Sequence, residues 1–176
     1  MPSGRTHDAI TVLLAVPTFA AAWGVTNNLA LAATATGAML FGGLMFGPDL
    51  DILSRQYTRW GPCRLLWWPY RVLFRHRSRW SHGIIFGTLI RVVYFALMLT
   101  LLACVAIYLR ATFMAGTPAD YGAVVRAWRA IEAGALVQGR ILHFVLAALA
   151  GLWWGAASHT LTDVAWSVLR KGSQIF

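Results

Sequence analysis

Long apolar stretches separated by short polar segments dominate the chain of 176 residues. Four of them approach the ~20 apolar residues that a helix needs to cross the hydrocarbon core of a bilayer. They cover residues 9–26, 29–47, 83–109 and 141–158. Hydrophobic residues make up 59% of the sequence, above the roughly 45–50% that is usual in soluble domains. The pattern predicts an all-α fold: a polytopic membrane helix bundle of about four transmembrane helices with additional interfacial helices, in a single domain over residues 1–176.

Only Asn27 and Asn28 separate the first two apolar stretches, which predicts a tight helical hairpin. A cleaved signal peptide is the alternative interpretation of the first stretch. It fits less well because a second apolar stretch follows at once. In addition, the residues before the first stretch include the acid Asp8 and have only Arg5 as a fixed positive charge.

The acidic residues are few, and most of them lie beside histidines or beside each other. The chain has six, and in so apolar a chain a carboxylate is costly unless it is paired, solvated or bound to a metal. The polar clusters are Thr6-His7-Asp8, Pro48-Asp49-Leu50-Asp51, Arg75-His76-Arg77-Ser78-Arg79-Trp80-Ser81-His82 and His159-Thr160-Leu161-Thr162-Asp163. An even number of crossings separates any two clusters, so four spans place all of them on one side of the membrane, where we expect them to converge.

The basic residues orient the predicted bundle. The cluster side carries Arg5, Arg55, Arg59, Arg64, Arg71, Arg75, Arg77, Arg79, Arg170 and Lys171. The opposite side carries Arg110, Arg126, Arg129 and Arg140, partly offset by Asp120 and Glu132. The positive-inside rule then places the clusters and both termini in the cytoplasm. Because topology explains much of the net charge of +9, a nucleic-acid partner is not expected.

The cytoplasmic segment 50–81 is rich in arginine and tryptophan. Its aromatic residues are Trp60, Trp67, Trp68, Tyr70, Phe74 and Trp80, interleaved with arginines. Such a segment typically lies at the lipid headgroups with its rings directed inward. Recognition of a phosphate-bearing substrate by the same arginines is a second, compatible interpretation.

The segment 111–140 on the opposite side carries a helix signal. Thr117 is a candidate cap, Pro118 suits a first helical turn, and Asp120 favours a helix N-terminus. We expect a short amphipathic helix there, without a chemical role.

Two pairs of candidate ligands have spacings that suit a metal site. His159 and Asp163 are four residues apart at a helix end, so both lie on one face; a simple hydrogen-bonded pair is the alternative. Asp49 and Asp51 follow a helix C-terminus, where the helix dipole disfavours negative charge. A cation would compensate them, and an arginine such as Arg55 is the other candidate.

His76 and His82 are six residues apart, so a bend must lie between them if both bind one centre. Arg77 between them has the forked guanidinium that holds a phosphate or carboxylate. Ser81 is a candidate cap of the third helix that would also orient His82.

Some polar residues have plainer interpretations. Asp8, next to the candidate ligand His7, would serve equally as the N-cap of the first helix. His143 opens the fourth stretch on the opposite side and is expected to be interfacial, not a ligand. Arg91, inside the third stretch, should face the bundle or extend to the membrane surface.

An ordered set of motifs resembles a known family. The stretches are Pro2-Ser3-Gly4-Arg5-Thr6-His7-Asp8, Phe41-Gly42-Gly43-Leu44-Met45-Phe46-Gly47-Pro48-Asp49-Leu50-Asp51, Ser54-Arg55-Gln56-Tyr57, Arg59-Trp60-Gly61, His76-Arg77-Ser78, Ser81-His82-Gly83 and Ser158-His159-Thr160-Leu161-Thr162-Asp163. Together they resemble a bacterial family of small metal-binding membrane proteins. That family is similar to the membrane-bound metal-dependent hydrolases and, more distantly, to zinc-dependent phospholipase C and single-strand nucleases. One departure from the hydrolase pattern is the serine, which here precedes His82.

The resemblance and the clusters together imply a metal-binding protein of the bacterial inner membrane. The candidate ligands are His7, Asp8, Asp49, Asp51, His76, His82, His159 and Asp163. The expected cofactor is a divalent metal, zinc first with manganese or iron as alternatives, in one or two ions.

The expected activity is hydrolysis of a phosphoester, from a lipid or a nucleotide, at the cytoplasmic membrane face. Asp51 would be a ligand or the base, and Arg77 would hold the anion. The alternative is a non-catalytic, metal-stabilised small subunit of a larger membrane complex, with membrane lipids and other subunits as partners. A metal-ion carrier is disfavoured because few polar residues lie within the apolar stretches.

Overall fold

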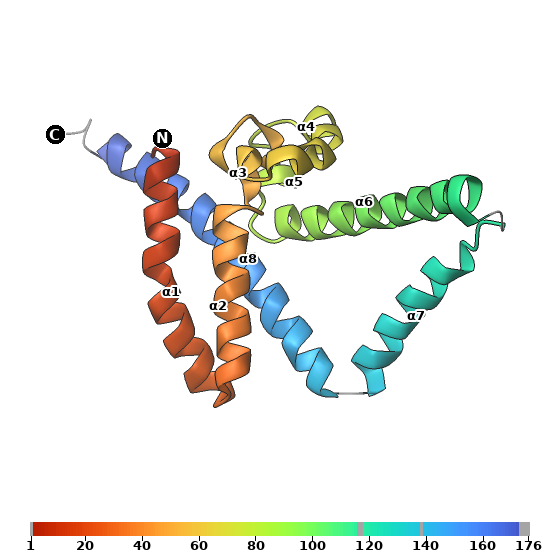
Figure 1. Cartoon of the computed structure of the whole chain (residues 1–176). Coiled ribbons are helices and arrows are strands. Elements are labelled where there is room, and N and C mark those ends of the chain that lie inside the picture. The colour runs from red at the N-terminus through yellow and green to blue at the C-terminus, as the bar shows by residue number, and fades with distance from the viewer. Residues whose placement is uncertain (1, 116–117, 138, 173–176) are drawn as a thin grey trace. The chain divides into compact units, whose positions relative to one another are not determined.

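A computed structural model describes residues 2–115, 118–137 and 139–172, and within these ranges all regular structure is helical. The long helices are α1 (Gly4–Thr26), α2 (Leu29–Leu44), α6 (Phe86–Arg110), α7 (Gly122–Val137) and α8 (Gly139–Gly172). The short ones are η1 (Pro48–Asp51), α3 (Arg55–Thr58), η2 (Gly61–Trp67), α4 (Trp68–Leu73), α5 (Arg79–His82) and η3 (Ala111–Ala115) (Figure 1). Four helical stretches are long and apolar enough to cross a membrane: Gly4–Thr26, Leu29–Asp51, Phe86–Phe113 and Ile141–Arg170. The expected all-α fold with four such stretches is confirmed.

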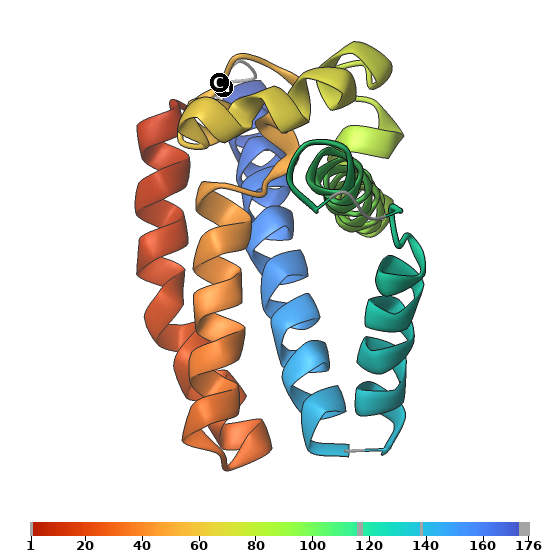
Figure 2. The ribbon, with the colours of Figure 1, turned by 45° about the vertical axis from the view of Figure 1, so that its right-hand side comes forward.

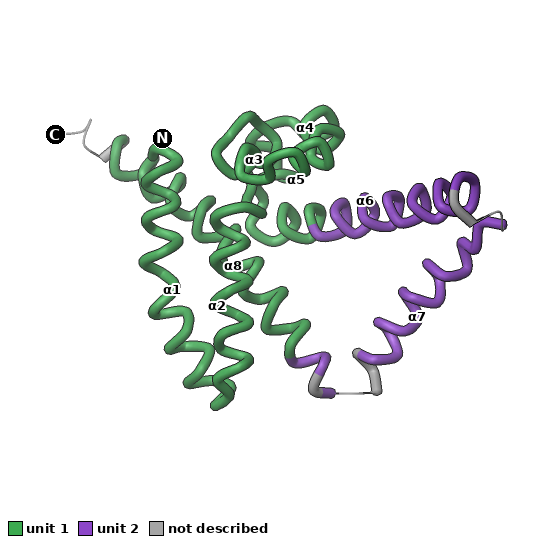
Figure 3. The backbone as a smooth tube through the Cα atoms, in the orientation of Figure 1, with its two compact units in different colours: residues 1–91, 144–176 green, residues 92–143 purple. Residues whose placement is uncertain are grey.

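The chain divides into two compact units (Figure 3). Unit 1 combines Met1–Arg91 with Phe144–Phe176, and unit 2 is Val92–His143. Helices α6 and α8 each contribute to both units. All the candidate site residues belong to unit 1.

The expected hairpin joins α1 and α2 in unit 1. Asn27 ends α1 in the left-handed conformation, with φ of 47°, which asparagine tolerates better than most residues. Asn28 caps α2, because its side-chain oxygen accepts hydrogen bonds from the backbone of Ala30 and Leu31. The two helices run side by side in opposite directions (Figures 1 and 2).

Glycines allow the backbones of α2 and α8 to touch (Figure 2). A Cβ atom added at Gly151 would collide with the carbonyl oxygen of Ala35, and one at Gly155 with that of Met39. From the other side, a Cβ at Gly42 would collide with the carbonyl of Leu152. This is the close approach that small residues spaced four apart permit between helices. These backbone contacts fix the position of α8 along the axis of α2.

The segment 50–81 folds into short helices around its own small core. Trp67 and Tyr70 are fully buried, and the Trp67 ring packs edge-on against Phe46 and Tyr70 at centroid distances of 5.3 and 5.7 Å. The expectation that the rings of this segment face lipid was therefore wrong for Trp67 and Tyr70, whose neighbours are other aromatic rings of unit 1. Trp68 and Trp80 remain exposed.

In unit 2, the helix expected within the segment 111–140 is present as α7, which spans 16 residues. It begins at Gly122, so the expected start was wrong: Pro118 and Asp120 precede the helix. Its Trp128 donates a hydrogen bond to Thr100 of α6 at 3.2 Å. The carboxylate of Asp120 pairs with Arg126. The candidate cap Thr117 lies outside the described residues.

Candidate metal centre

The polar residues that the sequence placed on one side of the bundle lie together in unit 1. They come from four parts of the chain: α1, η1, the segment that ends in α5, and α8. The members are His7, Asp49, Asp51, His76, His82, His159 and Asp163. The expected convergence is therefore seen in the structure, and each residue has a distinct place in it.

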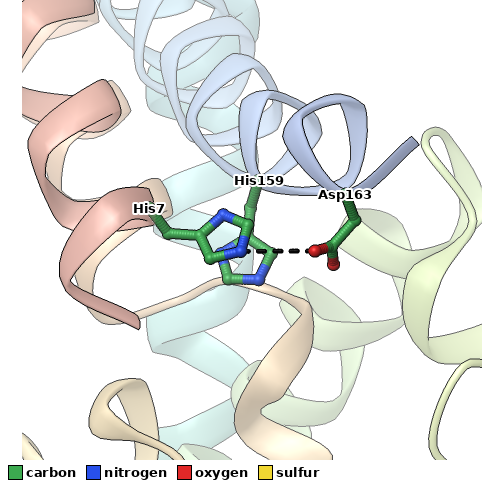
Figure 4. Close-up of side chains that lie close together, drawn as sticks. All are labelled: His7, His159 and Asp163. Atoms are coloured by element: carbon green, nitrogen blue, oxygen red, sulfur yellow. Dashed lines mark ion pairs between the residues drawn. The ribbon is translucent and has the colours of Figure 1, made fainter. Parts of the chain in front are cut away.

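His7, Asp163 and His159 form the first cluster (Figure 4). The His7 and His159 rings are buried and stacked, with centroids 3.8 Å apart and planes 10° apart. The carboxylate of Asp163 points at these rings, and its Oδ1 lies 3.3 Å from His7 Nε2. One nitrogen or oxygen from each residue lies within 4.8 Å of the other two. Asp163 thus reaches across to α1 instead of pairing with His159 on its own helix.

Asp49, His76 and His82 form the second cluster, whose candidate ligand atoms also lie within 4.8 Å of one another. The expected bend between the histidines is present, since Arg77 adopts a left-handed φ of 60° before α5 begins. Ser81 does not cap α6, which begins at Phe86; it lies inside α5, whose cap is Ser78. Its hydroxyl does lie 3.0 Å from His82 Nδ1, as expected of a residue that orients this ring. His82 ends this short helix and does not open α6.

The carboxylate of Asp49 connects the two clusters. Its Oδ2 lies 3.3 Å from His159 Nε2, and its Oδ1 lies 3.4 Å from His82 Nε2. Two ligands of one tetrahedral ion, each bonded at about 2.1 Å, lie about 3.4 Å apart. Each oxygen of Asp49 is therefore spaced from a histidine of a different cluster as two ligands of a shared ion would be.

Buried polar atoms without hydrogen-bond partners support a cation at these positions. Among the described residues they include His7 Nδ1, His82 Nε2, His159 Nε2, Asp163 Oδ1 and Asp51 Oδ2. Unpaired buried polar atoms are rare and costly. A divalent ion would satisfy histidine nitrogens and carboxylate oxygens together, and would take the place of any proton on a ligating nitrogen.

Asp51 lies behind the histidines of the second cluster. Its side chain is fully buried, with Oδ1 2.9 Å from His76 Nδ1 and Oδ2 3.6 Å from His82 Nδ1. The opposite nitrogen of His82 is the one that faces Asp49. Histidine ligands usually donate their second N–H to such a carboxylate, which fixes the orientation of the ring. This geometry suits Asp51 to orienting His76 through Oδ1, while the 3.6 Å from Oδ2 to His82 is too long for a hydrogen bond. The role of ligand or base expected from the sequence stays a prediction.

Gln56 is a buried site residue that belongs to one of the motifs of the resemblance but was not expected to have a role in the site. Its Oε1 accepts a hydrogen bond from the backbone of Asp49 at 3.1 Å, and its Nε2 donates to the carbonyl of Gly43 at 2.7 Å. The same Nε2 lies 3.3 Å from His159 Nδ1. Gln56 therefore links η1, α2 and α8 and directs His159 Nε2 toward Asp49. The place of Gln56 in the motif Ser54-Arg55-Gln56-Tyr57 was the available signal, but the residue type alone does not indicate this role.

Arg91 supports the turn that carries His82. It is 1% exposed and donates hydrogen bonds to the carbonyl of Ser81 at 2.7 Å and to Thr88 Oγ1 at 3.2 Å. Ser81 Oγ in turn lies 3.0 Å from His82 Nδ1. Arg91 was expected either to face the bundle or to extend to the membrane surface, and its side chain faces the bundle.

Asp8 lies apart from both clusters. Its carboxylate is held by Arg59, with bonds of 2.8 and 2.6 Å, and by Arg55 at 2.7 Å. These hydrogen bonds with Asp8 raise the pKa of the Arg59 guanidinium above its ordinary value. The N-cap of α1 is Ser3, not Asp8. Asp8 is therefore neither the N-cap nor a member of a metal cluster. Its salt bridges with Arg55 and Arg59 connect α1 to the segment after η1.

Two cavities open beside the centre. The Arg55 cavity, about 270 Å³, is lined by Gly4, His7, Asp8, Asp49, Leu53, Ser54, Arg55, Gln56 and His159. The Arg77 cavity, about 320 Å³, is lined by Arg77, His82, Thr160, Asp163, Val164, Ser167 and Val168. Both cavities therefore reach residues of the metal clusters. His143 is exposed in unit 2 and belongs to neither cluster.

The family model described as "Uncharacterized metal-binding protein (DUF2227)" matches residues 2–172. No curated protein and no solved structure matches the chain.

Proposed function

The chain belongs to this family of metal-binding proteins, and we propose that it is a hydrolase that cleaves a phosphoester at a two-metal centre. The observation that carries the proposal is the position of Asp49, with one carboxylate oxygen 3.3 Å from His159 and the other 3.4 Å from His82. A carboxylate shared in this way holds two ions close together. When bound, such a pair polarises a phosphoryl oxygen and activates water for attack on it.

The donor set favours a divalent first-row metal. It consists of histidine nitrogens and carboxylate oxygens from His7, Asp163 and His159 on one side and from His76 and His82 on the other. Zinc binds such mixed sets readily, and manganese and iron are the alternatives.

The residues around the ligands have supporting roles in this proposal. Asp51 holds Nδ1 of His76 and Ser81 Oγ holds Nδ1 of His82, so that the other nitrogen of each ring is directed to the ion. Gln56 does the same for His159. Arg77 lines the cavity that reaches His82 and Asp163, where a fixed positive charge suits an anionic substrate.

The proposed location is the inner membrane of a bacterium, with several crossings and both termini in the cytoplasm. It is supported by four helices of sufficient length and apolarity and by the excess of arginine on the side of the clusters. Reporter fusions test it. We expect a fusion at the amino terminus to label the cytoplasm, and insertions at Asn28 and at Pro118 to label the opposite compartment. Reverse labelling would overturn the proposed orientation.

Phosphoester turnover tests the proposed activity. We expect the detergent-purified, metal-loaded protein to hydrolyse p-nitrophenyl phosphate or its bis ester. Chelation by EDTA, or the change His159→Ala, should lower the rate by at least about 100-fold, because metal ligands and their supports cost that much in affinity or activity. The change Asp120→Asn in unit 2 is the control and should leave the rate unchanged.

A non-catalytic subunit is the second candidate, favoured by exposed apolar side chains such as Leu65 and Leu73, which are 72% and 71% exposed. No turnover of any phosphoester by metal-loaded protein that co-purifies with a stoichiometric partner would favour this candidate over the hydrolase.

A further inference from the structure

The two cavities beside the metal centre differ in whether their arginine is already bonded within the protein. In the Arg55 cavity, the guanidinium of Arg55 is already bonded to Asp8 at 2.7 Å, so it has a partner within the protein. In the Arg77 cavity, the Arg77 side chain has no hydrogen bond or ion pair with any residue that the structure describes. Of the two arginines, Arg77 is therefore the one whose guanidinium has no bonded partner among the described residues and can accept an anion.

The Arg77 cavity also reaches both halves of the centre. His82 of the second cluster and Asp163 of the first line it together with Arg77. A guanidinium binds two oxygens of one phosphoryl group through its parallel N–H groups. A phosphoryl group held by Arg77 would thus lie next to residues of each proposed metal position.

Part of the remaining wall of this cavity is apolar, beside the polar Thr160 and Ser167. Val164 and Val168, four residues apart on α8, line it and are 54% and 64% exposed. A volume of about 320 Å³ is near the lower end for ligand pockets, roughly 300–1,000 Å³. It suits a phosphate headgroup and the first carbons of its substituent, with a longer apolar tail continuing outside along the exposed valines.

We infer that the Arg77 cavity binds the headgroup of a lipid phosphate monoester, with the phosphoryl group on Arg77 and the apolar part against Val164 and Val168. The inference rests on the proposed function, since it names the substrate class of the same site. A free phosphate or a soluble phosphate ester shares the phosphoryl chemistry but makes no use of the apolar wall.

Affinities for the metal-loaded protein, measured by microscale thermophoresis in detergent, distinguish a lipid phosphate from a soluble phosphate ester and from free phosphate. The probes are phosphatidic acid in mixed micelles, glycerol 3-phosphate and inorganic phosphate. We expect phosphatidic acid to bind at least about 10-fold more tightly than glycerol 3-phosphate, because only the lipid covers the apolar wall. The change Val164→Asn should weaken phosphatidic acid several-fold and leave glycerol 3-phosphate unchanged.

Arg77→Gly is the decisive variant, because glycine accepts the left-handed backbone of position 77 at least as well as arginine does. A loss of binding is then not a loss of folding. We expect this variant to bind all three probes at least about 10-fold more weakly with metal content unchanged. Arg79→Gln is the control. Arg79 is two residues from Arg77 and does not line the cavity, so this variant should bind the probes as the wild type does.

The outcomes distinguish this inference from the proposed function. Wild-type binding by Arg77→Gly would overturn the inference, and turnover of phosphoesters by the same protein would leave the proposed hydrolase standing. Equal affinity for glycerol 3-phosphate and phosphatidic acid would overturn the lipid as ligand. Binding of phosphatidic acid that depends on Arg77 and Val164, without turnover, would support the cavity while refuting the hydrolase.

Discussion

Replacing Asp49 with alanine is expected to remove most of the metal from both clusters at once. Its two oxygens face His159 Nε2 and His82 Nε2 at 3.3 and 3.4 Å, so one change removes a ligand from each proposed ion. His7→Ala and His76→Ala each affect a single cluster and should each lose about one of two equivalents. Metal content per chain, measured by inductively coupled plasma mass spectrometry on detergent-purified protein, checks the expectation.

Two further variants separate coordination from folding. Asp49→Asn keeps the shape of the side chain but replaces one oxygen with an amide nitrogen, so it should lose metal while its helical circular dichroism stays unchanged. Asp120→Asn removes an exposed acid of unit 2 and should keep full metal content. If Asp49→Ala lost no more metal than His76→Ala, the shared carboxylate would be wrong and Asp49 would belong to one ion alone.

The apolar pattern predicted much of the fold, because long apolar stretches have few ways to be arranged. The sequence predicts the helical hairpin with its turn at Asn27 and Asn28, where α1 ends and α2 begins. The even number of predicted crossings indicated that His7, Asp49 and His159 would lie at the same end of the bundle. What the pattern left open was where each helix begins: α1 starts at Gly4, five residues before the apolar stretch.

That early start decides the fate of His7 and Asp8. Within a helix, consecutive side chains point about 100° apart. His7 therefore faces α8, while Asp8 faces Arg55 and Arg59. If both residues preceded the helix, as the apolar stretch predicts, His7 and Asp8 could bind the same ion.

The same reason separates Asp49 from Asp51. A ligand pair was expected from their spacing, but both lie in the 3₁₀ turn η1, where three residues complete a turn. Residues two apart then point to different sides: Asp49 lies between His159 and His82, and Asp51 lies behind His76. Turn geometry of this kind depends on contacts such as the Gln56 bond to Asp49, which come from distant parts of the chain.

Replacing Gly155 with valine is expected to damage both stability and metal binding. A Cβ at this position would collide with the carbonyl oxygen of Met39 and lie 2.7 Å from the backbone nitrogen of Gly43. Backbone atoms cannot rotate aside, so α8 must move away from α2. Overpacking of this kind costs about 1–3 kcal/mol or more. His159 lies one turn beyond Gly155 on the same face of α8, so it would move away from Asp49 as well.

The measurements are the thermal midpoint of unfolding in detergent and the metal content of the same preparation. For Gly155→Val, we expect a midpoint several degrees lower, since about 1 kcal/mol shifts a domain of this size by roughly 2–4 °C, together with loss of metal. Gly37→Val is the matched control: it makes the same substitution in α2, where no atom lies within 4 Å of the added Cβ, and should change neither quantity. Because the glycine contacts set the position of α8 along the axis of α2 and thereby the distance from His159 to Asp49, a lower midpoint with full metal content would show that the centre assembles without this contact.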